Sequence, residues 1–180
     1  PGLQRLIVPR ASLTLAERVE PLVKVLRSEL DETASFMVRT GWEVEALVTE
    51  ASGQALRYAI EPGEKKPLHS LAGGKAILAS IPADELDRYF AECPRPRFTA
   101  HTVVDEGALR LQLEQVRREG LAVACEENTP GICGMACPAW FEGKPAGAFA
   151  VALPAVRFDE SLAARAGAAL SRAAASLAGG

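Results

Sequence analysis

Residues 120–158 read GLAVACEENTPGICGMACPAWFEGKPAGAFAVALPAVRF. We interpret this segment as three strands, near residues 121–127, 132–140 and 146–153, with a tight turn at Pro130-Gly131. Successive side chains of a strand point to opposite faces of a sheet, so each of these strands has a bulky face and a face of small side chains. The small face carries, strand by strand, Ala122, Ala124 and Glu126, then Gly134, Ala136 and Pro138, then Ala148, Ala150 and Ala152.

The small face allows two interpretations. A helix can lie close against it, or the face can border a cavity for a small molecule. Glu126 favours the cavity, because a carboxylate is costly to bury without a partner, whereas beside a cavity it can meet water or a ligand donor.

The rest of the chain predicts helices and further strands. Thr14 and Glu17 form a capping box ahead of an apolar stripe from Leu15 to Leu30, in which Pro21 should kink the helix or mark the start of its regular part. Further strands are expected at 35–39, 42–49 and 56–60, and helices at 71–80, at 82–90, between Asp105 and Gly120, and after Asp159.

This order predicts an α+β domain with a mainly antiparallel sheet. The N- and C-terminal helices should cover one face. Short helices and loops should close a ligand pocket over the other face.

Composition narrows the class of protein. A chain of 180 residues can form one domain with a substantial core. A net charge of −3 argues against this segment being a nucleic-acid-binding surface. The sequence has neither an apolar run of about 20 residues, as a membrane span needs, nor a signal peptide. We therefore expect a cytoplasmic protein with no membrane partner.

The cysteines are Cys93, Cys125, Cys133 and Cys137. They form no Cys-x-x-Cys pair, and a chain of this size needs no disulfide framework. We expect Cys125, Cys133 and Cys137 to be small buried hydrophobic residues and expect no metal or other cofactor. The alternatives are a metal site that also uses His69, or redox sensing.

A second wall of the predicted pocket is expected at Leu68–Lys75. Gly73 and Gly74 stand at a strand-to-helix junction, where backbone amides can approach a ligand and the helix start favours an anionic group. No phosphate-binding loop is present, so Lys75 is interpreted as a surface or helix-packing residue. His69 is equally compatible with a structural role and with a ligand contact.

Catalysis is not expected. The sequence has only two histidines and no Gly-x-Ser-x-Gly motif. A Cys137 nucleophile beside His69 is the one enzymatic arrangement to consider.

Several motifs resemble the IclR family of bacterial transcriptional regulators. LHSLAGGKAILA at residues 68–79 is similar to the family's His-Ala-x-Ala-x-Gly-Lys-Ala-Leu-Leu-Ala motif, and VRREGLAV at 116–123 to its Val-Arg-x-x-Gly-Tyr-Ala-Val segment. Glu126-Glu127-Asn128 with Gly131, and Pro154 with Arg157-Phe158, fall where the family has Glu-Glu, Gly and Pro-x-x-Arg. The resemblance extends from the first long helix to the last.

The resemblance implies a GAF-like effector-binding domain at residues 13–178, assembled into homodimers or tetramers. It also implies a preceding winged helix-turn-helix domain that binds operator DNA, with residues 1–12, chiefly Leu3 to Arg10, as a remnant of the linker. The residues that would bind the effector, from the motifs and the small face together, are Leu68, Ala72, Gly73, Ala124, Glu126, Gly134, Ala150 and Ala152.

This sequence departs from the family pattern in its pocket. The family often has Asp at position 124, Cys at 134, and Ser at 150 and 152, and Leu153 replaces a usual Gly. Loss of these polar groups favours an aromatic or apolar effector over a small oxo-acid. The alternative function is a free-standing GAF-like metal or redox sensor that uses Cys125, Cys133 and Cys137.

Overall fold

A computed structural model of the chain describes residues 13–58 and 60–180. The expected linker remnant at residues 1–12 lies outside the described residues. The first helix, α1 (Leu15–Leu30), begins at the predicted capping box: the Glu17 N–H donates to the Thr14 hydroxyl, and the Thr14 N–H donates to the Glu17 carboxylate. The helix continues through Pro21, so the expectation that its regular part begins there is wrong.

The described residues form a sheet of six strands. They are β1 (Thr33–Thr40), β2 (Glu43–Glu50), β3 (Lys65–Pro67), β4 (Ala122–Cys125), β5 (Ile132–Phe141) and β6 (Lys144–Pro154). Their order across the sheet is β3-β2-β1-β6-β5-β4, and every neighbouring pair is antiparallel. The two groups of strands therefore meet at β1 and β6, which are far apart in the sequence.

The strand expected at residues 56–60 is wrong. The third strand is instead the short β3, which pairs with β2 beyond the turn at Gly63. Tyr58 and Ile60 pack against the core on the α2 side of the sheet, while Leu56 is 61% exposed. This segment is therefore a loop that packs Tyr58 and Ile60 against the core, and it does not pair with the edge of the sheet.

The helices begin and end close to the predicted positions. They are η1 (Leu68–Ser70), α2 (Ala72–Ser80), α3 (Ala83–Glu92), α4 (Glu106–Glu119), η2 (Ala155–Arg157) and α5 (Glu160–Ala178). Asp105 and Asp159 cap α4 and α5 by accepting backbone N–H bonds at 2.8 Å, and Gly120 ends α4 in the left-handed conformation. None of the described helices is long and apolar enough to cross a membrane.

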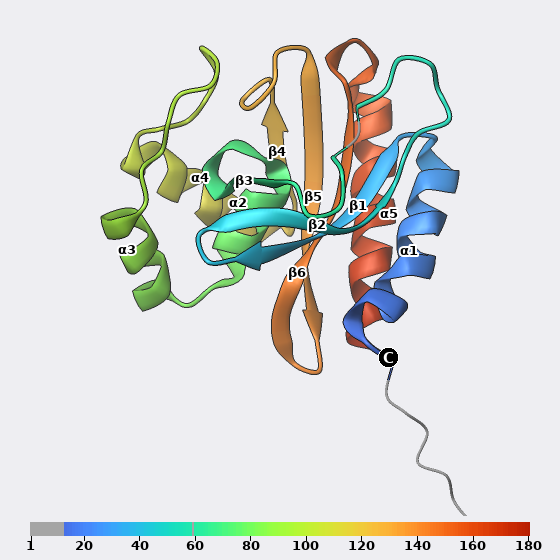
Figure 1. The fold of residues 1–180 in the computed structure, drawn as a ribbon, viewed down its shortest axis with the longest axis horizontal. Helices are drawn as coiled ribbons and strands as arrows, with labels where there is room; N and C mark the ends of the chain where they lie inside the picture. Colours follow the sequence, from blue (N-terminus) through green and yellow to red (C-terminus); the bar gives the residue numbers. More distant parts are fainter. Residues whose placement is uncertain (1–12, 59) are drawn as a thin grey trace, which may run out of the picture.

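Figure 1 shows the layers: α1 and α5 lie on one side of the sheet, and α2, α3 and α4 lie on the other. The bulky residues of β5 and β6, including Met135, Phe149 and Val151, share a core with α1 and α5. Ala136 and Ala148 share the opposite core with α2 and α4. The predicted α+β class, the antiparallel sheet and its coverage by the terminal helices are confirmed.

Helix α2 lies directly on the small face, and Gly74 fixes how it joins η1. A Cβ atom at Gly74 would lie 2.1 Å from the carbonyl oxygen of Leu68, so only glycine fits. A Cβ at Gly134 of β5 would lie 3.5 Å from the Cβ of Ala72. Much of the room beside the small side chains is therefore occupied by α2 itself.

A buried ion pair ties α2 to the loop between β4 and β5. Lys75 and Glu127 are 1% and 7% exposed, and the Lys75 ammonium donates to the Glu127 carboxylate at 2.5 Å and to Gln112 of α4 at 2.7 Å. Burial lowers the pKa of Lys75 and raises the pKa of Glu127, and the attraction between the two charges opposes both shifts. The prediction that Lys75 is a helix-packing or surface residue missed this partner.

Gly74→Ala should destabilise the domain by about 3 kcal/mol, because the new methyl group meets backbone atoms that cannot rotate away. Gly107→Ala is the matched control: Gly107 is exposed in the first turn of α4 and its added Cβ would approach only the Asp105 side chain, at 3.2 Å. Urea unfolding should show the loss for Gly74→Ala and little change for Gly107→Ala. Equal stability of the two variants would contradict the packing described.

Lys75→Met should destabilise the domain by about 3–5 kcal/mol near pH 8, because it leaves Glu127 buried without its cation. The raised pKa of Glu127 sets the sign of the pH dependence. A carboxyl group whose pKa is higher in the folded state than in the unfolded state reduces the stability of the fold as the pH rises through the folded-state pKa. The loss should therefore be smaller at pH 5.5 than at pH 8, because burial raises the pKa of Glu127 and a lower pH favours its uncharged form.

The double variant Lys75→Met, Glu127→Gln removes the stranded charge and should recover much of the stability at pH 8. Urea unfolding at the two pH values measures both effects. A loss that is independent of pH, or a double variant no more stable than Lys75→Met, would show that the pair is not the source.

Candidate functional site

Two small hollows remain at the N-terminal end of α2, where the small face is not fully covered. Each has a volume of about 40 Å³, enough for a water molecule but not for an organic ligand. The first is lined by Tyr58, Ser70, Leu71, Ala72, Ala124, Glu127, Asn128, Thr129, Ile132 and Ala152. The second is lined by Ser35, Met37, Tyr58, Ile60, Leu71, Ala72, Gly73, Ala150, Val151 and Ala152.

The two hollows are neighbours. Tyr58, Leu71, Ala72 and Ala152 line both. Tyr58 comes from the loop after β2, whereas the others belong to the start of α2 and to β6. The hollows are thus two lobes of one region, with these four side chains between them.

Five of the predicted site residues line these lobes: Ala72, Gly73, Ala124, Ala150 and Ala152. Gly134 lies beneath Ala72, and Leu68 is fully buried behind the start of α2. The expectation that the whole small face borders a cavity is wrong toward Ala148, which is fully buried in the core that it shares with α2. Only the end near Ala150 and Ala152 stays open.

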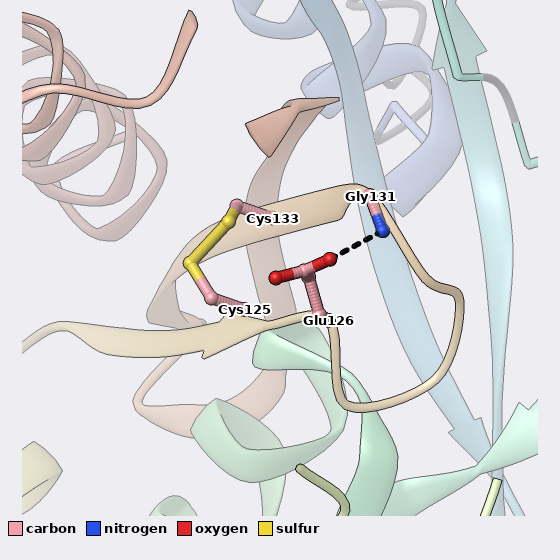
Figure 2. The surroundings of a disulfide bond; sticks show 4 residues. All are labelled: Cys125, Glu126, Gly131 and Cys133. Carbon is pink, nitrogen blue, oxygen red and sulfur yellow. Dashed lines mark hydrogen bonds between the residues drawn. A yellow bond between two sulfur atoms is a disulfide. The ribbon is translucent and has the colours of Figure 1, made fainter. Parts of the chain in front are cut away.

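Glu126 does not point into either hollow. Strand β4 ends at Cys125, and Glu126 takes a left-handed conformation with φ of 56°. Its carboxylate accepts a hydrogen bond from the Gly131 N–H at 2.8 Å and so closes the β4–β5 loop, as Figure 2 shows. The prediction followed strand alternation one residue too far, and the carboxylate at the first hollow is that of Glu127.

A disulfide lies beside Glu126 (Figure 2). Cys125 and Cys133 are paired residues of β4 and β5, with their Cα atoms 4.0 Å apart, and they are bonded to each other. The expectation that both are free hydrophobic residues is wrong, whereas Cys137 is free and buried. The bond closes the loop that carries Glu127, Asn128 and Thr129 to the first hollow.

The metal alternative is not supported. His69 donates from Nε2–H to the Pro96 carbonyl oxygen at 2.9 Å, and its ring stacks on Phe98. Cys137 instead lies in the core under α1 and α5, and Cys125 and Cys133 are bonded to each other, so the proposed site of His69 with these three cysteines does not form. In residues 13–58 and 60–180, no group of three or more His, Cys, Asp or Glu side chains is placed to hold a metal ion. Burial lowers the pKa of His69, which fits a structural imidazole.

Polar groups missed by the sequence interpretation surround the first hollow. The Asn128 amide donates to the Ser70 hydroxyl at 2.9 Å, and the Ser70 hydroxyl donates to the Pro67 carbonyl. Thr102 donates to the Glu127 carbonyl at 2.6 Å, which anchors the loop from the other side. Glu127 and Asn128 follow Glu126 directly in the sequence. The adjacent carboxylates of Glu126 and Glu127 were therefore the sequence feature that could have indicated these polar residues.

The start of α2 also presents backbone N–H donors toward the lobes. Leu71 caps the helix without a side-chain hydrogen bond, and the first backbone bond into the helix is from Lys75 N–H to Leu71. No backbone acceptor within residues 13–58 and 60–180 bonds the first-turn N–H groups of Ala72 and Gly73, so these groups can bind an acceptor at the lobes.

Comparisons with known proteins agree with this geometry. The family model described as bacterial transcriptional regulator IclR C-terminal matches residues 10–178. The HTH-type transcriptional regulator Rv1719 of Mycobacterium tuberculosis is 33% identical over 146 residues, which are 81% of this chain and 56% of that protein. The chain spans about half the length of the curated regulators it matches.

Solved structures share the fold. The transcriptional regulator RHA06195 from Rhodococcus sp. RHA1 superposes with a TM-score of 0.87 at 25% identity, covering 92% of this chain and 68% of that one. The inducer-binding domain of PobR from Acinetobacter, in complex with 3-hydroxybenzoic acid, superposes with a TM-score of 0.83. It is 20% identical and covers 92% of this chain and 98% of that one, so the likeness is one of fold. The fold is GAF-like, and the chain belongs to the IclR family of bacterial transcriptional regulators, as a C-terminal effector-binding domain.

Proposed function

We propose that this domain senses an aromatic or apolar organic metabolite that carries one hydrogen-bond acceptor, and that it binds this effector at the two lobes beside α2. The observation that carries the proposal is the pair of neighbouring hollows on the alanine-lined end of the sheet, at a helix start with free N–H groups. The relatives are named transcriptional regulators, which favours sensing over catalysis.

The lobes as they stand are too small for such a ligand, because sites for organic molecules usually have volumes of about 300–1,000 Å³. Binding therefore requires movement of a side chain that separates them. Tyr58 is the largest of the four shared residues and the one that comes from a loop. We infer that the ring of Tyr58 moves aside and that the lobes then join into one elongated site.

The chemistry of the walls suggests how the ligand lies. Ser70, Glu127 and Asn128 give the first lobe polar groups, whereas Met37, Ile60 and Ala150 make the second lobe apolar. An acceptor on the ligand would meet the first-turn N–H groups of α2, and an apolar body would extend over Ala150 and Ala152. The absence of hydroxyl and carboxylate side chains at positions 124, 150 and 152 disfavours a small oxo-acid.

Signalling would then follow the usual thermodynamics of linked sites. The effector would shift the domain, or a homodimer or tetramer of it, between two states, and an N-terminal winged helix-turn-helix domain would read the shift at operator DNA. Coupling free energies of about 1–3 kcal/mol suffice for such regulation.

Ala150→Phe should weaken effector binding by filling the second lobe. A panel of benzoic, 3-hydroxybenzoic and indole-3-acetic acids, titrated by calorimetry, identifies a ligand for the unmodified chain, and the variant should bind it at least about tenfold more weakly, equivalent to 1.4 kcal/mol. PobR suggests the hydroxybenzoic acid. Ala91→Phe, at an exposed position of α3, is the control and should bind normally. Unchanged affinity in Ala150→Phe would remove the second lobe from the site.

Tyr58→Ala should join the lobes and raise the association rate of the same ligand, because no ring has to move before entry. Tyr58→Phe keeps the ring and loses only the hydroxyl, so its rate should stay near that of the unmodified chain. Stopped-flow measurement of the association rate separates the two variants. If Tyr58→Ala and Tyr58→Phe bind at the same rate, Tyr58 does not obstruct the site.

A further inference from the structure

A separate cavity lies at the opposite, C-terminal end of α2. Its volume is about 440 Å³, which falls in the range typical of small-molecule sites. Its walls come from the end of β1, the last turn of α2, the connection to α3, and the first residues of β6. It shares no lining residue with the two hollows near Tyr58.

The cavity arises because β1 and β6 separate. Their pairing runs from Thr33 with Ala152 to Met37 with Ala148. Beyond that point β1 continues to pair with β2, and the start of β6 pairs with β5. The contact just before the separation is very close: a Cβ at Gly147 would lie 2.2 Å from the Met37 carbonyl oxygen. The space is thus a product of the sheet topology.

Arg39 is the cation of this cavity and is incompletely bonded. Its Nη2 donates to the Glu85 carboxylate at 2.5 Å, and its guanidinium carbon lies 5.0 Å from the centre of the Trp42 ring. Its Nη1 is buried and has no hydrogen-bond partner among the described residues. A buried guanidinium nitrogen without an acceptor is unfavourable, and a small rotation toward the cavity would let a ligand oxygen satisfy it.

We propose that this cavity binds an apolar monocarboxylic acid whose carboxylate accepts hydrogen bonds from Arg39. Val38, Ile77 and Pro145 provide an apolar wall for the body of the acid. Glu85 already supplies one negative charge beside Arg39, so a ligand with two carboxylates is disfavoured. This site does not depend on the proposed effector site.

The test is a titration of the ¹⁵N-labelled chain with cyclohexanecarboxylate, followed by two-dimensional amide NMR. The amides of Val38, Ser80 and Gly147 should shift and saturate, whereas cyclohexylmethylamine, a cation of similar shape, should leave them unchanged. Arg39→Met should weaken carboxylate binding at least tenfold. Arg110→Met is the matched control, because Arg110 also stacks on an aromatic ring and pairs with acids, but lies outside the cavity.

Glu85→Gln provides a second variant if Arg39→Met fails to fold. It removes the competing anion beside Arg39 and should tighten carboxylate binding several-fold. The proposal is overturned by unsaturable shifts, by shifts confined to Gly73 and Ala150, by equal binding of the amine, or by unchanged affinity in Arg39→Met or Glu85→Gln. Shifts confined to Gly73 and Ala150 would instead place the acid in the effector lobes, so the two sites are tested separately.

Discussion

The contact between Lys75 and Glu127 holds together three parts of the chain that are remote in sequence. Lys75 belongs to the helix on the small face, Gln112 to the helix behind it, and Glu127 to the loop that borders the first lobe. Two charges this deeply buried are unfavourable alone and stable only together. The position of α2, and with it the shape of both lobes, depends on that pairing.

Small side chains on the sheet serve two purposes along the same strands. Toward Ala148 and Gly134 they let α2 approach closely, and toward Ala150 and Ala152 they leave the lobes open. Each of the two interpretations of the alanine face, close packing of a helix and the wall of a cavity, is therefore correct for part of the face. Helix α2 contacts an empty space at each end, the lobes at Ala72 and the larger cavity at Ser80, so a ligand at one end bears on the helix that borders the other.

Most of the fold could be predicted from local patterns. Capping residues such as Thr14, Asp105 and Asp159 and the alternation in β6 act within a few residues, so the sequence displays them directly. Features that depend on distant partners were missed. The Cys125–Cys133 bond follows from the register of β4 and β5, and the burial of Lys75 follows from a carboxylate 52 positions away.

Two other errors share a different cause. Residues Leu56, Tyr58 and Ile60 alternate as in a strand, but they lie in a loop that packs Tyr58 and Ile60 against the α2 side of the sheet and leaves Leu56 exposed. At Glu126 the strand ends one residue early, so the face assigned to that residue belongs to no strand. For the candidate site, composition indicated the alanine-lined wall, whereas the polar residues of the first lobe come from loops whose course no periodic pattern describes.

The margins of the sheet have a consequence for aggregation and assembly. One outer strand, β3, is only three residues long and reads Lys-Lys-Pro, and the other, β4, has four residues. Short outer strands with lysine and proline discourage the backbone of another molecule from adding to the sheet. Copies of this domain that associate would thus gain little from pairing their backbones at β3 or β4, and side chains would decide which partner is accepted there.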